Sequence, residues 1–291
     1  MSKCALCGEE RELEKSHIIP KFVFRSMKKN SPTGNMRMAS QPNRVIQDGD
    51  KQAMLCGVCE DRFSQNETIF ANKVYHPYHS DNLQVVEYGL WLNYFITSVS
   101  WRSLYLDIIG FVSEQNIDIK ELDTLIEAEQ IMREFLLGKR IDLGHIENHI
   151  FFFGPIKEVA GDTSEFELHT AIGGSVVGYT YISHDFDSSY VFLNLQGILI
   201  VTILKKAVEE VWKNTLVGEN GTFNMEKPNH SVSSPVFNEL FALANDLKES
   251  RQKISESQKE KIVEGIKKNP ERFLKSKAYQ RLKDDERIRK N

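Results

Sequence analysis

The chain has 291 residues, of which 41% are hydrophobic and 27% are charged, and its formal net charge is −4. This composition is typical of a globular protein and excludes disordered, collagen-like and disulfide-rich classes. No apolar run reaches the roughly 18 residues that a membrane-spanning helix needs, and the acidic residues near the start are unlike a signal peptide. We therefore expect a cytoplasmic protein that makes no membrane contact.

Charge is distributed unevenly along the chain. Residues 1–79 carry 12 Lys or Arg against 9 Asp or Glu, residues 80–250 carry 11 against 25, and residues 251–291 carry 14 against 7. A polyanion would be attracted to the two ends and repelled by the middle. A solvated charged surface would have the same composition, so the charge pattern alone leaves both interpretations open.

Residues 1–79 contain short predicted elements around two Cys-x-x-Cys pairs. Alternation predicts a strand over 12–19, and Pro20 followed by an apolar stripe predicts a helix over 20–30. The Asp-Gly dipeptide at 48–49 predicts a hairpin over 44–55. A helix then follows the second Cys pair, over about 60–73.

The rest of the chain changes from helical to strand-like periodicity and back. Residues 83–137 have the pattern of core and amphipathic helices, and 236–289 that of charged helices. Strand-like segments lie between them, and a helix is expected to resume near Lys205. The strand-like segments are 145–156, 165–174, 176–183 and 189–204. We predict an α+β protein with a zinc module at 1–79 and a larger mixed helical body with a small antiparallel sheet at 80–291, ending in a basic helical segment at about 236–291.

All four cysteines of the chain lie in the two Cys-x-x-Cys pairs. Thiolates favour zinc, and structural zinc sites are closed tetrahedra of four protein ligands. The spacing therefore predicts a structural Zn²⁺ ion held by Cys4, Cys7, Cys56 and Cys59. Four separate buried cysteines or a redox pair are the alternatives.

The predicted order is a tight turn with the first Cys pair (a zinc knuckle), a strand, a hairpin and a helix that carries the second Cys pair. This is the order of elements in a treble-clef zinc fold. With CALCG, LEKSHIIP and AMLCGVCE in this order, residues 1–75 resemble the HNH endonucleases, a ββα-metal family with a zinc-stapled subtype. The resemblance implies that His17 is the general base that activates water, and that a divalent ion, Mg²⁺ or Mn²⁺, lies against the scissile phosphate. It also implies a nucleic-acid substrate, expected to be DNA, in a phage-defence or mobile-element setting.

Two positions differ from the family pattern, because Ser16 stands where Asp is usual and Glu60 where His is usual. Glu60 and Glu67 share one edge of the predicted helix, and carboxylates suit Mg²⁺ or Mn²⁺. We therefore expect Glu60, with Glu67 behind it, to supply the catalytic ligands. A buried, hydrogen-bonded structural role and a role as a metal ligand are the alternatives for His17.

Basic residues between the Cys pairs are expected to contact phosphates, although a solvated basic surface would look the same. They are Lys21, Arg25, Lys28, Lys29, Arg37 and Arg44. The acidic body would then regulate, oligomerise or bind a protein partner. The rival hypothesis is a non-catalytic zinc module that binds nucleic acid or a protein partner.

Overall fold

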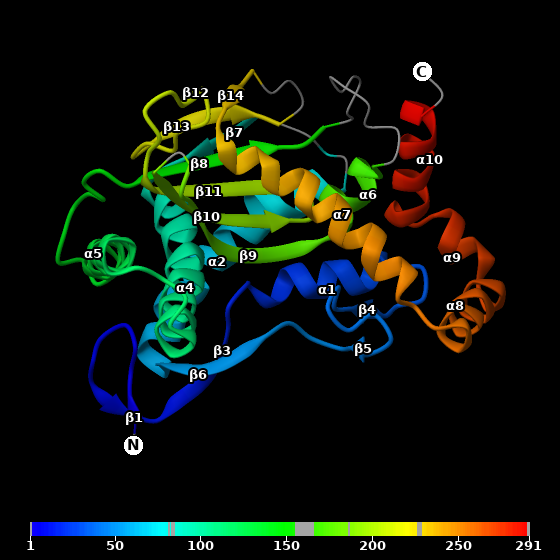
Figure 1. Ribbon diagram of the computed structural model, residues 1–291, viewed down its shortest axis with the longest axis horizontal. Helices are drawn as coiled ribbons and strands as arrows, with labels where there is room; N and C mark the ends of the chain where they lie inside the picture. The colour runs from blue at the N-terminus through cyan, green and yellow to red at the C-terminus, as the bar shows by residue number, and fades with distance from the viewer. Residues whose placement is uncertain are drawn as a thin grey trace.

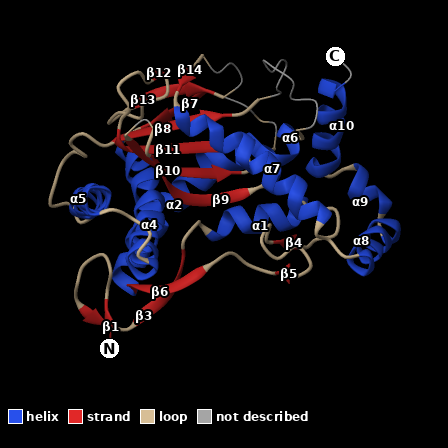
Figure 2. Ribbon diagram, in the orientation of Figure 1, coloured by secondary structure: helices blue, strands red, loops and turns tan. Residues whose placement is uncertain are grey.

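The computed structural model describes residues 2–80, 82, 85–154, 166–185, 187–225 and 229–289. It confirms the mixed α+β class, with small antiparallel sheets and long helices (Figure 1 and Figure 2). The central sheet has four strands in the order β8–β11–β10–β9, and every neighbouring pair is antiparallel. These strands are β8 (Glu147–Phe152), β9 (Val176–Ser183), β10 (Ser188–Leu195) and β11 (Ile198–Lys205).

Helices cover both faces of this sheet, which explains why every residue of β10 is buried. Side chains alternate between the faces of a strand. Val191 and Leu193 pack in one apolar cluster with α4 (Leu90–Glu114), whereas Tyr190 and Phe192 pack in a second cluster with α7 (Asn238–Gln252). In Figure 1, α7 crosses the near face of the sheet. Strand β10 is therefore buried on both of its faces.

Two strands and a helix form the framework of the N-terminal region. Strand β3 (Leu13–His17) runs antiparallel to β6 (Lys51–Cys56), with Leu13 opposite Cys56 and His17 opposite Lys51. Helix α2 (Gly57–Phe70) follows β6 directly and continues through a π-helical turn, Ala71–Tyr75, into α3 (His76–His79). The other elements here are β1 (Ser2–Lys3), β2 (Glu10–Arg11), α1 (Lys21–Asn30), β4 (Met36–Arg37) and β5 (Val45–Ile46).

One apolar cluster joins the N-terminal region to the rest of the chain. It contains Leu6 and Phe63 from the region of the Cys pairs, Phe95 and Val99 from α4, and Leu125 from α5 (Ile119–Leu136). Phe70 stacks on Phe95 with ring centroids 3.9 Å apart. Residues on either side of position 79 thus bury their side chains in the same core.

The C-terminal helices lie beside α1, at the right of Figure 1. The Nε of Arg272 donates to the carbonyl of Ser31 at 3.2 Å, and the side-chain amide of Asn43 donates to the carbonyl of Lys253 at 3.0 Å. The basic C-terminal segment therefore contacts the basic insertion between the two Cys pairs. Its helices after α7 are α8 (Glu256–Lys268), α9 (Pro270–Leu274) and α10 (Lys277–Arg289).

Several local predictions were wrong, in each case because partners distant in sequence determine the structure. The hairpin over 44–55 does not form, since β5 pairs with β4 and β6 with β3. Helix α6 (Leu168–Gly174) replaces the strand predicted over 165–174, and the buried Asp285 caps it by accepting from the amides of His169 and Thr170.

Short strands replace two predicted helical stretches. Strand β7 (Val85–Tyr88) pairs with β13 (Gly221–Asn224), and β12 (Val211–Lys213) pairs with β14 (Ser231–Ser233). A short 3₁₀ turn, Pro235–Phe237, precedes α7. The predicted strand over 145–156 is β8, and its last two residues, 155 and 156, lie outside the described part of the chain.

Candidate functional site: a four-cysteine centre and a histidine–aspartate pair

The four cysteines lie together, as their spacing predicted. Their sulfur atoms all lie within 4.8 Å of one another, and all four are free thiols. The turn after the first pair closes through Gly8, whose φ of 78° lies in the left-handed region that glycine favours and whose amide donates to the Cys4 carbonyl at 2.9 Å. The second pair begins α2, with Cys56 at its N-cap and Cys59 in its first turn.

The local environment sets the cysteines' acidity in different directions. Burial raises the pKa of Cys59, and the neighbouring Cys4 raises it further. Burial also acts on Cys4, but donation from the backbone amides of Cys7 and Cys56 outweighs it and lowers the pKa of Cys4 to about 7. The Cys56 amide lies 3.4 Å from the Cys4 sulfur. Amide donors directed at sulfur are the surroundings that a thiolate needs.

The donor set fits a tetrahedral metal ion. With metal–sulfur bonds of about 2.3 Å, a tetrahedron places its sulfurs roughly 3.8 Å apart. The sulfurs of Cys7 and Cys56 are 3.9 Å apart. The four cysteines can therefore bind a metal such as zinc with little rearrangement.

His17, the last residue of β3, forms a pair with an acidic residue. Its Nε2 lies 3.0 Å from Oδ1 of Asp48, whose other oxygen is 2.5 Å from Nζ of Lys51. Burial opposes ionisation of Asp48, but bonds from Lys51 and His17 outweigh burial and hold its pKa well below the usual range. The side chain of His17 is 14% exposed, so the ring is largely buried, and one of its nitrogens is oriented by a carboxylate.

Glu67 is held by an arginine from the body. The Nη2 of Arg102, on α4, lies 2.6 Å from Oε1 of Glu67, and its Nη1 donates to the His17 carbonyl at 2.7 Å. The Arg102 side chain is 1% exposed. Glu67 and His17 are thus brought near each other through one guanidinium.

Ser16 is buried and Glu60 is half-buried, and each has an unsatisfied side-chain oxygen. The Oγ of Ser16 and the Oε1 of Glu60 are both enclosed without a hydrogen-bond partner. Glu60 follows Cys59 and lies near the end of the β3–β6 pair where Leu13 is opposite Cys56. His17 lies at the other end of this pair, opposite Lys51. Among the described residues, His17, Glu60 and Glu67 do not form a group of three potential metal ligands.

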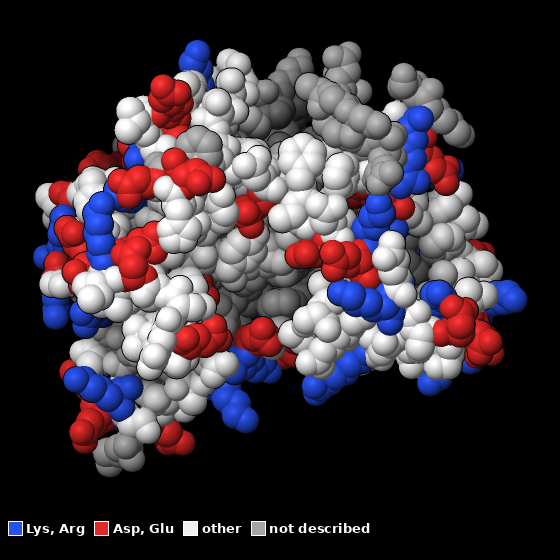
Figure 3. All heavy atoms as spheres, in the orientation of Figure 1, with Lys and Arg blue, Asp and Glu red and all other residues white. Residues whose placement is uncertain are grey.

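The predicted phosphate-contacting residues fall into two sets. Lys21, Arg25, Lys29 and Arg44 are exposed. Arg37 instead donates to the Pro42 carbonyl at 2.7 Å and to Gln258 at 3.0 Å, and Lys28 donates to Gln47. Figure 3 shows acidic side chains among the basic ones over the face in view.

The sequence did not assign Asp48 and Arg102 to the site. Asp48 was recognised only as a turn residue, and its partnership with His17 depends on the register between β3 and β6. Arg102 carried a usable signal, since it is a cation inside an otherwise apolar predicted helix. Buried Arg residues almost always have charged or polar partners.

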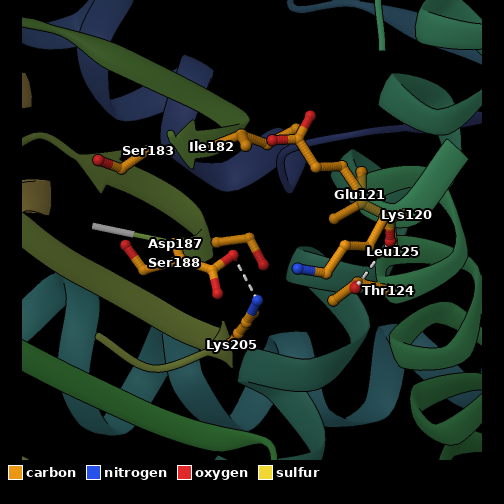
Figure 4. A pocket seen from close by; sticks show the side chains of 10 residues that line it. Lys120, Glu121, Thr124, Leu125, Ile182, Ser183, Asp187, Ser188 and Lys205 are labelled. Atoms are coloured by element: carbon orange, nitrogen blue, oxygen red, sulfur yellow. Dashed lines mark hydrogen bonds and ion pairs between the residues drawn. The ribbon is translucent and has the colours of Figure 1, made fainter. Parts of the chain in front are cut away.

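A further group of potential ligands lies on the body. Asp118, Glu121 and His184 bring their ligand atoms within 4.8 Å of one another; Asp118 and His184 are exposed and Glu121 is half-buried. Beside them lies a cavity of about 20 Å³, enough for one water molecule. Figure 4 shows Lys120 and Lys205 directed into it, and Lys205 pairs with Asp187 at 2.5 Å.

Four other histidines differ in burial. His149, buried in β8, lies 2.8 Å from the Thr215 hydroxyl, whereas His145 is exposed. Burial lowers the pKa of His79 to about 3, and His76 is exposed.

In the described part of the chain, no helix combines the length and the apolar character needed to cross a membrane. No protein-family model, curated protein or solved structure matches this chain.

Proposed function

We propose that the protein is a nucleic-acid endonuclease of HNH type, with a structural zinc ion in a treble-clef module and His17 as general base. The observation that carries the proposal is the 3.0 Å contact between His17 Nε2 and Asp48 Oδ1. A histidine oriented by a carboxylate, at the end of a strand and beside a metal-stapled helix, is an arrangement suited to removing a proton from water.

The four cysteines would hold the zinc ion and stabilise the small module. Metal binding in such sites supplies folding free energy, about 10–16 kcal/mol in isolated zinc-finger peptides. A rigid β3–β6–α2 unit then keeps His17 in a fixed position. In this role the zinc is structural and takes no part in hydrolysis.

His17 and Asp48 would divide the work of base catalysis. When Nε2–H donates to Asp48, Nδ1 of His17 is the nitrogen with a free lone pair. That nitrogen takes the proton from the attacking water, and the ionised Asp48 stabilises the imidazolium that results. Lys51, paired with the other oxygen of Asp48, keeps the carboxylate ionised.

A catalytic Mg²⁺ or Mn²⁺ ion does not fit the described residues as a preformed site, because His17 lacks two further ligands within reach. Magnesium commonly keeps several waters and binds through one or two carboxylates together with substrate phosphates. Any such ion would therefore depend on the nucleic acid for its binding. The proton transfer described above involves His17 and Asp48 alone.

Plasmid nicking tests the proposal. Supercoiled DNA is incubated with zinc-loaded wild type, His17→Ala and Asp48→Asn, each with Mg²⁺, with Mn²⁺ and without any added divalent ion; a labelled single-stranded RNA is assayed in parallel. His76→Ala, which removes an exposed histidine from α3, is the control. We expect nicking by wild type and the control, and loss of at least a hundredfold in rate on replacing His17. Equal cleavage by wild type and His17→Ala would exclude His17 as the base.

The second candidate function is a non-catalytic zinc module that binds nucleic acid or a protein. The observation that favours it is the burial of Ser16 and of the Oε1 atom of Glu60, at the two positions where the HNH pattern has metal ligands. Exposed Lys21, Arg25 and Lys29 on α1 would then supply phosphate contacts. Salt-dependent binding of DNA without cleavage, weakened by substituting these three residues, would support this function over the first.

A further inference from the structure

Arg102 links three elements through a single buried guanidinium. It lies on α4, which belongs to the body and packs beside α2 of the module (Figure 1). Its Nε donates to the Ser98 carbonyl of its own helix at 3.2 Å, its Nη1 to the His17 carbonyl at 2.7 Å, and its Nη2 to Glu67 at 2.6 Å. Its guanidinium carbon lies 5.3 Å from the centre of the Phe63 ring.

The chemistry of arginine explains why no other residue would make these contacts together. Guanidinium is planar and always charged, and its donors diverge in a fixed fork. One such group can bond to a carbonyl on β3 and a carboxylate on α2 while its stem stays in the apolar core. Lysine has a single nitrogen and would not span the same two acceptors with the same geometry.

The contact on β3 is made at the residue proposed as the base. The Arg102 bond is to the backbone of His17, while the ring of His17 bonds to Asp48 on the loop before β6. Because backbone and ring are held from two sides, displacement of the backbone would lengthen the 3.0 Å contact between Nε2 and Oδ1. The orientation and tautomer of the ring thus depend on a residue 85 positions away.

We propose that Arg102 is a positioning residue for His17, so that helix α4 of the acidic body forms part of the support of the active site. This inference rests on the proposed function for its catalytic consequence. Its structural consequence, a single fixed tautomer of His17, can be measured without any nuclease assay. Glu67 acts here as the counter-ion of Arg102 and orients its guanidinium.

The test uses the full-length zinc-loaded chain with ¹⁵N-labelled histidine. Long-range ¹H–¹⁵N spectra report which ring nitrogen of His17 carries the proton, with His17→Ala to assign the signals. We expect one Nε2-protonated form in wild type at neutral pH. Arg102→Lys should give a mixture of tautomers, with nicking at least tenfold slower and an unchanged zinc content.

Glu129→Gln is the matched control. Glu129, on α5, accepts a bond from Trp101 at 2.8 Å, so this change also removes a largely buried carboxylate that contacts α4, but one without a contact to His17. It should leave the His17 tautomer and the nicking rate at wild-type values. A similar disturbance of His17 by Glu129→Gln would reduce the role of Arg102 to general stability and overturn the proposal.

The remaining outcomes are also informative. A folded Arg102→Lys variant with the wild-type tautomer and rate would overturn the proposal. If that variant does not fold, Glu67→Gln replaces it, since it keeps Arg102 and removes only its counter-ion; an unchanged His17 in that variant overturns the proposal equally. If wild type does not nick DNA but Arg102→Lys still alters the tautomer, the positioning role stands and the nuclease function fails.

Discussion

His149 is a buried base, and its protonation should make the free energy of unfolding depend on pH. Its side chain is 1% exposed, and burial lowers its pKa to about 4 although Glu147 at 3.2 Å opposes this. The unfolded chain takes up the proton near pH 6.5, whereas the folded chain does not until about pH 4. Stability is therefore lost as pH falls through this window, by about 2 kcal/mol at pH 5 from His149 alone.

Urea unfolding of wild type and His149→Gln at pH 7 and pH 5 measures this coupling. The variant should be less stable at pH 7, because it loses the bond to Thr215, but its free energy of unfolding should fall less between the two pH values. His145→Gln, at an exposed position four residues earlier, should follow wild type. An equal fall in the free energy of unfolding between pH 7 and pH 5 for wild type and His149→Gln would contradict this role of His149.

Asp48 should show a dependence of the same sign in a lower pH window. Because Lys51 and His17 hold its pKa below the usual value, its contribution to stability is complete above about pH 4 and is lost as the pH falls towards the folded value. Its side chain is 32% exposed, so the contribution should be below about 1 kcal/mol. The difference in unfolding free energy between wild type and Asp48→Asn should shrink from pH 5 to pH 2.5. The difference from Asp50→Asn, an exposed neighbour, should stay constant.

At the scale of elements, local pattern was sufficient where an element carries its own apolar stripe or run. The predicted helices near 20–30 and 60–73 and the strand at 176–183 are present, and α4 and α5 lie within the helical stretch 83–137. The strand-like segment 189–204 forms two strands, β10 and β11. Strand β7 and helix α6 were mispredicted because β13 and Asp285, both distant in sequence, decide them. The same reason explains why only part of the site could be predicted. Local spacing is enough to bring the four cysteines together, whereas the partners of His17 depend on the register between β3 and β6 and on the packing of α4.

The close approach of α4 and β9 gives a prediction for a single glycine. A Cβ at Gly178 would lie 2.5 Å from Cδ2 of Leu193, which is fully buried, and 3.1 Å from the Ser103 hydroxyl. Gly178→Ala should therefore lower the free energy of unfolding by about 1–3 kcal/mol. Gly110→Ala, inside α4 with nothing within 4 Å of its Cβ position, should raise it by about 0.5–1 kcal/mol. Thermal unfolding of both variants checks the pair, and a neutral Gly178→Ala would show that Leu193 can move.

At the scale of the whole molecule, the shared core predicts that the cysteine module and the body unfold together. Leu6, Phe63 and Val99 belong to one apolar cluster, and the buried Arg102 joins α4 to both β3 and α2. Breaking a buried ion pair by removing one partner typically costs about 3–5 kcal/mol. Separation of the module from the body would expose both this pair and the apolar core.

Zinc removal tests this cooperativity. On heating, zinc release, followed with a chromogenic chelator, should coincide with the change in tryptophan fluorescence from Trp91 and Trp101 at the first apolar cluster and Trp212 at the second. Chelation before heating, or Cys56→Ser, should shift the whole transition to lower temperature, by about 2–4 °C for each kcal/mol of stability lost in a chain of this size. Zinc release well below the fluorescence transition would contradict the prediction, because it would mean that residues 1–79 unfold as a separate unit and that the shared core does not couple them to the body.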